Sequence, residues 1–204
     1  MQFLKILTPL MAGAVLATAV PLLAHAQGND DSVLTEMSQA FRKGDRKKLT
    51  QLLPQARGHV LEPWAAYWEL KARLDEASPQ EVDAFLARYA GTYQEDRLRN
   101  DLLLLLGQRR DWANFAVHHP QYRMSDDREV RCYALLVDQL KGSSTPPEAV
   151  AEELRRNWYA QRDADDGCNT AADRLYAARR ISELDVWRKA RLAMDANRPR
   201  AVRN

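Results

Sequence analysis

The chain has 204 residues, only eight glycines, and 30 basic against 28 acidic side chains, for a formal net charge of +2 at pH 7. A length of this order predicts one domain once any leader is removed. The two charge signs are interspersed, so we expect no nucleic-acid partner, which would favour a strongly basic face. The dominant residues, chiefly Ala, Leu, Arg and Glu, are good helix formers and predict an all-α fold.

Residues 1–26 have the organisation of a secretory signal peptide. One basic residue precedes an unbroken apolar run, which ends at the small-residue triplet Ala24-His25-Ala26. We therefore expect cleavage after Ala26, which makes Gln27 the first residue of an exported mature protein. Residues 27–31 are polar and are expected to form a short flexible linker.

The same apolar run is nearly long enough to act as a membrane anchor. Pro9, Pro21 and the cleavage triplet favour removal instead. No cysteine follows the cut, which disfavours a lipid anchor. We therefore expect no stable membrane insertion after cleavage.

From residue 32 onward, apolar residues recur at three- and four-residue spacings, which predicts a series of amphipathic helices over residues 32–204. The first stripe ends at Gly44-Asp45, where a glycine stop meets an N-cap residue. The next stripe begins directly afterwards, around Leu49. These two helices are expected to form a hairpin.

The hairpin pattern repeats along the chain. Ser78, Pro79 and Glu81 have the spacing of a capping box with proline in the first turn. Five helix pairs are expected, with internal turns near Gly44, Ala77, Gly107, Gly142 and Arg180. A spacing of roughly 30 to 40 residues is the period of a helical-hairpin solenoid, in which each pair buries its apolar face by stacking on the next. A compact helical bundle is the alternative.

Three of the turns carry clusters of basic residues, in "FRKGDRKKL", "LGQRRDWANF" and "YAARRISELDVW". Cations near a helix C-terminus interact favourably with the helix dipole, so capping is one interpretation. A basic rim that contacts an anionic polymer is the other. The sequence does not separate them.

The mature chain has two cysteines, Cys132 and Cys168. Thiols outside the cytoplasm tend to be oxidised, which favours pairing. A catalytic thiol is the alternative, and it would need a basic partner such as His59, His118 or His119. Nothing in the spacing places a histidine beside either cysteine.

Motifs for nucleotide, zinc-protease and serine-hydrolase chemistry do not occur in the sequence, and no cofactor is expected. A glycan-cleaving enzyme would need a carboxyl group with a raised pKa, commonly near a second carboxylate. Acidic residues such as Glu152-Glu153 are expected on solvent faces or at caps, so no catalytic residue is assigned. Neighbouring residues such as His118 and His119 point in different directions on a helix, so no metal site is assigned either.

Eight aromatic residues lie within the apolar stripes. Aromatic rings can stack on sugars, but at helical spacing they are expected in the core. They are Trp64, Tyr67, Trp68, Trp112, Trp158, Tyr159, Tyr176 and Trp187.

Three longer segments resemble the N-terminal part of the soluble lytic murein transglycosylase family. They are "FRKGDRKKLTQLLPQARGHVLEPWAAYWELKARL", "FLARYAGTYQEDRLRNDLLLLLGQRRDWANF" and "CYALL…GCNTAADRLYAARRISELDVWRKARLAM". The family shares a Gly-Asp turn followed by a Tyr-Trp pair, an acidic-Arg-Leu-Arg run before an Asp-Trp turn, and a cysteine that opens a later helix. The resemblance covers residues 32–204.

The resemblance implies a right-handed, U-shaped α-superhelix in the periplasm, with Cys132 and Cys168 as the matching disulfide pair. In complete family members, a lysozyme-like domain cleaves the MurNAc–GlcNAc β-1,4 bond of peptidoglycan and leaves a 1,6-anhydro-MurNAc end. The catalytic residue there is a Glu in a Glu-Ser motif, and no Glu is followed by Ser in this sequence.

We therefore expect the superhelical scaffold region of such an enzyme, without the catalytic domain and incomplete at its C-terminus. The expected partners are peptidoglycan glycan strands and proteins of the cell-wall machinery. A free-standing periplasmic helical-repeat adaptor that binds a protein partner is the alternative.

Overall fold

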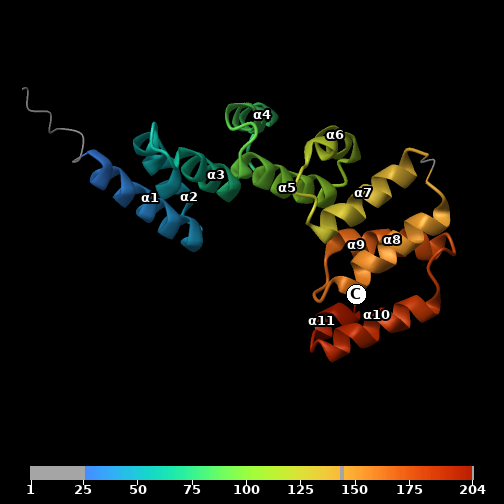
Figure 1. Cartoon of the computed structure of the whole chain (residues 1–204). Coiled ribbons are helices and arrows are strands. Elements are labelled where there is room, and N and C mark those ends of the chain that lie inside the picture. Colours follow the sequence, from blue (N-terminus) through green and yellow to red (C-terminus); the bar gives the residue numbers. More distant parts are fainter. Residues whose placement is uncertain (1–25, 143–144, 204) are drawn as a thin grey trace, which may run out of the picture.

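The computed structural model describes residues 26–142 and 145–203. Over these ranges the chain contains α-helices and short 3-10 turns and no strand. The helices follow one another as hairpins along an elongated body that bends at its C-terminal end (Figure 1). The predicted right-handed α-superhelix of helix hairpins is confirmed, and the compact bundle is not formed.

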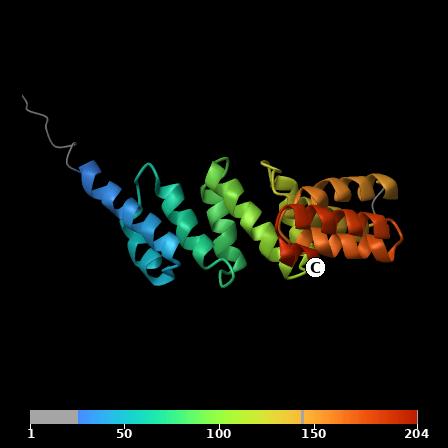
Figure 2. The same ribbon diagram turned by 90° about the horizontal axis from the view of Figure 1, so that it is seen from below.

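The hairpins occur in chain order. They are α1 (Ala26–Lys43) with α2 (Arg46–Leu52), α3 (Glu62–Ala72) with α4 (Pro79–Arg88), α5 (Tyr93–Gln108) with α6 (Trp112–His118), α7 (Arg128–Leu140) with α8 (Pro147–Ala160), and α9 (Asp166–Ala177) with α10 (Glu183–Asp195). The 3-10 turns η1 (Leu53–Ala56) and η2 (His119–Gln121) extend α2 and α6, and α11 (Pro199–Arg203) follows α10. α1 packs on α3, α3 on α5, α5 on α7, and α7 on α9, which gives one continuous row of helices (Figure 2).

Local sequence sets the helix ends. Gly44 has a φ of 69°, which glycine adopts without strain, and the Asp45 side chain accepts a hydrogen bond from the backbone N–H of Lys48 at 3.0 Å. Ser78 and Glu81 form both hydrogen bonds of a capping box at the start of α4. Both predicted boundaries are confirmed.

The expected linker is helical. α1 begins at Ala26, so residues 27–31 form its first turns and the linker prediction is wrong. The Asp31 carboxylate lies 3.0 Å from His59 Nε2, which ties this end of α1 to the loop before α3. The predicted signal peptide and Ala24 lie outside the described residues, whereas Ala26 and Gln27 open α1, so cleavage stays a prediction. Of the helices described, none is long and apolar enough to cross a membrane.

The buried side chains form three successive clusters within the described residues. The first joins α1, α2 and α3, the second runs from α3 to α7, and the third lies between α7 and the start of α10. Each hairpin therefore buries its apolar face against the next one, as a solenoid requires.

Two glycines allow close contact in the row formed by α5, α7 and α9. A Cβ added to Gly107 would lie 2.4 Å from ring carbons of Tyr133, and one added to Gly167 would lie 2.7 Å from the Glu129 carbonyl oxygen. Gly107, expected at a turn, thus lies inside α5, and the turn follows at Arg110, whose φ is 59°.

Several large apolar side chains are exposed at the C-terminal end of the body. Leu184, Trp187 and Met194 of α10 are 77%, 64% and 53% exposed, and Tyr176 of α9 is 46% exposed. The core prediction is therefore wrong for Trp187 and Tyr176. Periodicity identified the apolar stripe, but no helix of the described chain covers it.

Candidate functional site

Cys132 and Cys168 are joined in a disulfide that links α7 to α9, with their Cα atoms 4.8 Å apart. Both residues are completely buried in the third cluster. Neither sulfur is a free thiol, so neither residue serves as a nucleophile or as a metal ligand.

A polar cluster surrounds this disulfide. The Arg110 guanidinium binds both carboxylate oxygens of Asp166, one of them at 2.9 Å, and the Tyr133 hydroxyl donates to the same carboxylate. The Glu129 carboxylate accepts hydrogen bonds from the backbone N–H groups of Asp166 and Gly167 at 3.1 and 3.2 Å. These bonds hold α5, α7 and α9 together.

Two carboxyl groups of the cluster have opposite pKa shifts. Burial, with the nearby Asp165 charge, raises the pKa of Glu129, whereas the hydrogen bond from Arg110 lowers the pKa of Asp166 despite partial burial. Such a divergence is typical of acid–base pairs in enzymes. Both groups are already bonded within the protein, and the main clefts of the described chain are lined by other residues. These bonds give both carboxyl groups a structural role in joining α7 and α9.

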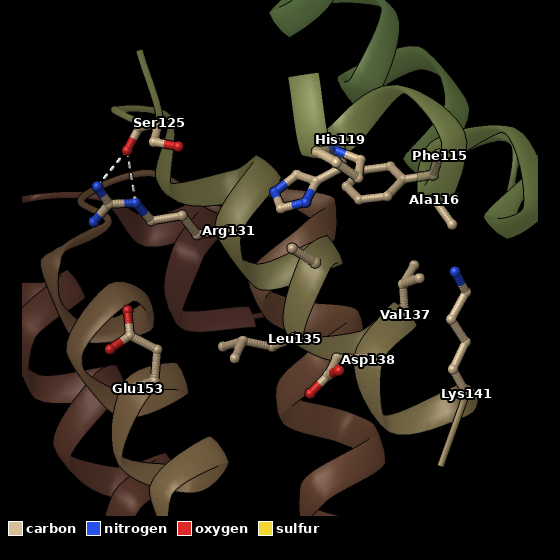
Figure 3. A pocket seen from close by; sticks show the side chains of 12 residues that line it. Phe115, Ala116, His119, Ser125, Arg131, Leu135, Val137, Asp138, Lys141 and Glu153 are labelled. Atoms are coloured by element: carbon tan, nitrogen blue, oxygen red, sulfur yellow. Dashed lines mark hydrogen bonds between the residues drawn. The ribbon is translucent and has the colours of Figure 1, made fainter. Parts of the chain in front are cut away.

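A cleft of about 500 Å³ lies where the third hairpin meets the fourth (Figure 3). One wall is formed by Phe115 and His119, whose rings stack at a centroid distance of 5.4 Å, and Leu135 contributes to the apolar surface. The rim is charged, with Lys141 and Glu153 among its residues.

The groups that line this cleft are suited to binding. Burial lowers the pKa of His119, so its imidazole is neutral at pH 7, and no hydrogen bond to a carboxylate orients it among the described residues. Arg131, at the rim, donates to the Ser125 carbonyl, as Figure 3 shows. The cleft suits an amphipathic group with both apolar and charged parts.

A second cleft of about 500 Å³ lies between α4, α5 and η2. Arg99 and Arg123 line it, and both donate to the buried Glu95 carboxylate, at 2.5 and 2.8 Å. Burial and the Arg99 charge lower the pKa of His118, whose Nδ1 lies 3.5 Å from Arg99 Nη1. Arg99 and Glu95 lie on the same helix, so the Arg123 pair is the one that holds α5 against the loop before α7.

Four acidic side chains are buried, contrary to the expectation that acidic residues lie on solvent faces or at caps. They are Glu69, Glu95, Asp96 and Asp101. Asp96 accepts from the backbone N–H groups of Arg123 and Met124 at 2.9 and 2.7 Å, and Asp101 accepts from the Tyr67 hydroxyl at 2.8 Å. All four are paired and therefore structural. The four-residue spacing of Glu69 and Arg73, and of Glu95 and Arg99, is the signal in the sequence that could have pointed to two of them.

One arginine of each of the three basic turns pairs with a carboxylate of a neighbouring hairpin. Arg46 contacts Asp75 at 3.2 Å, Arg180 contacts Glu148 at 3.1 Å, and Arg110 binds Asp166 as described above. In the part of the chain that the structure describes, no group of three or more His, Cys, Asp or Glu side chains has the arrangement of a metal site.

Solved structures of lytic transglycosylases contain a similar fold. The 70 kDa soluble lytic transglycosylase of Escherichia coli matches 86% of this chain at 18% identity with a TM-score of 0.59, over 28% of its own length. A 70 kDa soluble lytic transglycosylase in complex with bulgecin A matches 83% at 18% identity with a TM-score of 0.58, over 26% of its length. An inactive variant of lytic transglycosylase Slt from Pseudomonas aeruginosa matches 83% at 25% identity with a TM-score of 0.57, over 27% of its length.

This chain thus spans little more than a quarter of the length of these enzymes. No family model matches the sequence. No curated protein matches it either. The similarity shows that this chain has the superhelical fold found within lytic transglycosylases.

Proposed function

We propose that this chain is the superhelical scaffold region of a periplasmic peptidoglycan lytic transglycosylase. The observation that carries the proposal is the fold similarity, which extends over 86% of the chain at a TM-score of 0.59. The resemblance of residues 32–204 to the same family, with its two cysteines, supports it independently.

The proposed role is to contact glycan strands and to orient a catalytic domain that cleaves MurNAc–GlcNAc β-1,4 bonds to 1,6-anhydro-MurNAc products. The acidic groups described above support a scaffold role, because each buried carboxylate is used to join helices. We assign no catalytic residue and no cofactor to this chain.

Co-sedimentation with purified peptidoglycan sacculi tests the proposal. We expect the mature chain to pellet with sacculi in a saturable manner and to release no 1,6-anhydro muropeptides. Release of such products by the pure chain would contradict the scaffold role, and a chain that stays in the supernatant would contradict glycan contact.

One observation favours a second candidate, a helical-repeat adaptor that binds a protein. Leu184, Trp187 and Met194 of α10 are all more than half exposed, and exposed apolar side chains of this size are typical of protein interaction surfaces. For the adaptor, replacing Trp187 by Ser should abolish capture of a protein partner from periplasmic extract. The scaffold role predicts that the same variant pellets with sacculi as the parent does.

A further inference from the structure

The positive charge of this nearly neutral chain is concentrated at one end. Residues 178–204, which follow α9, contain eight basic and three acidic side chains, whereas residues 1–177 contain 22 basic and 25 acidic ones. The last segment therefore has a formal charge of +5 in a chain whose net charge is only +2. Such an asymmetry is typical of a surface that meets an anionic partner.

The same segment exposes large apolar side chains on α10. Leu184, Trp187 and Met194 are each more than half exposed, and Arg191 is exposed between them. The four positions are three, four and three residues apart, so they lie in one line along the helix. This line, Leu184–Trp187–Arg191–Met194, is the outer face of α10.

The opposite side of α10 is fixed against α8. Lys189 is buried, and its ammonium donates to the carbonyl oxygens of Trp158 and Gln161 at 2.6 and 2.5 Å. One turn earlier, the Asp185 carboxylate accepts a hydrogen bond from the Tyr159 hydroxyl at 2.6 Å. These bonds set the rotation of α10 about its own axis, so its outer face points away from the protein before any partner arrives.

Free cations accompany the outer face. Arg179, Arg188 and Arg191 are exposed, and none of them makes an ion pair within the described residues. The Arg188 guanidinium lies over the Tyr159 ring, 5.0 Å from its centroid, which holds it beside the outer face. Because Asp185 is turned toward α8, an anionic partner meets more cations than acidic groups here.

The outer face is accessible to a broad, flat partner. α10 and α11 form one end of the body, and no other helix of the described chain lies beyond them (Figures 1 and 2). A planar surface can therefore approach along the whole length of α10 without meeting the other hairpins.

We propose that the outer face of α10 docks on the surface of a bilayer that contains anionic phospholipids. Helices that lie in a membrane interface place Trp and Leu at the boundary between headgroups and acyl chains and keep basic side chains among the headgroups. Arg191 suits such a site, because its methylene groups can stay beside Trp187 while its guanidinium reaches a phosphate. The inference goes beyond the proposed function and does not depend on it.

Two other classes of partner compete for this face. A nucleic acid or an acidic polysaccharide would be bound through its charges and would leave the apolar side chains uncovered. A protein, as in the adaptor described above, would cover the apolar side chains but does not require the excess of positive charge. A bilayer with anionic headgroups matches both features in one layer.

Co-sedimentation with vesicles tests the proposal. The protein is residues 27–204, because the apolar run within residues 1–26 would itself bind lipid. The vesicles are phosphatidylcholine alone or an equal mixture of phosphatidylcholine and phosphatidylglycerol. We expect binding to the mixed vesicles that is about tenfold or more tighter than to the neutral ones and that weakens as salt is added.

Two variants separate the apolar contribution from the charge. Trp187→Ser should weaken binding to the mixed vesicles about tenfold or more, and Arg191→Gln should weaken it about fivefold. Both side chains are exposed, so the thermal unfolding temperature should not change. Val60→Ser and Arg57→Gln are the matched controls, because both residues are exposed near the other end of the body, and they should bind as the parent does.

The outcomes that overturn the proposal are distinct. Equal binding by the parent and Trp187→Ser would show that the apolar side chains do not contact lipid, which would leave only a surface for polyanions. Equal binding to neutral and mixed vesicles would show that the cations do not contribute. A chain that binds neither kind of vesicle but captures a protein through Trp187 would assign this face to the adaptor function. Loss of vesicle binding in Trp187→Ser with unchanged pelleting on sacculi would support the proposal and leave the scaffold role intact.

Discussion

Removal of the Cys132–Cys168 disulfide should cost this chain a large share of its stability. The two cysteines are 36 residues apart in sequence and are completely buried between α7 and α9. In the chain-entropy account, freeing a loop of this length in the unfolded state lowers the free energy of unfolding by about 4 kcal/mol. The perturbation is the double replacement of Cys132 and Cys168 by Ala, which keeps the site apolar.

Urea unfolding followed by circular dichroism measures the effect. We expect a loss of about 4 kcal/mol in the double variant and a similar loss in the parent protein under reducing conditions. The double variant itself should be insensitive to reductant, which serves as the control. A loss below about 1 kcal/mol would refute the reasoning, because the α7–α9 junction would then be held without the covalent link.

Three further predictions follow from packing and charge. Gly107→Ala should lower the free energy of unfolding by about 1 to 3 kcal/mol, because the added Cβ meets the Tyr133 ring. The control, Gln108→Ala at the exposed neighbouring position, should leave it unchanged. Unchanged urea midpoints for both variants would contradict the close α5–α7 contact. Lys189→Met should also lower the free energy of unfolding, by about 1 to 3 kcal/mol. The Lys189 ammonium donates to the Trp158 and Gln161 carbonyl oxygens at 2.6 and 2.5 Å, and Met leaves both without that donor. Equal thermal unfolding temperatures for the variant and the parent would contradict this. Burial alone would raise the pKa of Asp185, but hydrogen bonds from Tyr159, Ser182 and Arg155 hold it below its ordinary value of 3.8. The stability that the ionised Asp185 adds is therefore present above about pH 4 and is lost as pH falls. Asp185→Asn should flatten the acid side of a plot of unfolding temperature against pH, and a curve parallel to that of the parent would contradict the assignment.

The sequence predicted the parts of this fold that depend on local chemistry. The helix stop at Gly44 and the capping box at Ser78 and Glu81 need only residues close to one another in the chain, and the structure contains both. The period of the hairpins followed from the spacing of apolar stripes. These features are local, so one sequence is enough to recognise them.

Features that depend on distant residues were missed. Asp96 accepts hydrogen bonds from the backbone N–H groups of Arg123 and Met124, which lie 27 and 28 residues further along the chain, and no local pattern marks such a pairing. Apolar periodicity likewise predicts which side of α10 is apolar, but it does not show whether another helix packs on that side. Trp187 was therefore expected to be buried, whereas it is exposed. The ring contacts of Phe41 with Trp68 and of Trp64 with Tyr93 were missed for the same reason, since these rings come from three helices that only the fold brings together.

Quantitative binding to sacculi tests the central claim most directly. The mature chain, at increasing concentration, is pelleted with a fixed amount of purified peptidoglycan, and the bound fraction is compared with that of an unrelated helical-repeat protein of similar charge. A glycan-contacting scaffold predicts a saturable isotherm for this chain and none for the control. A bound fraction equal to that of the control at every concentration would contradict the account.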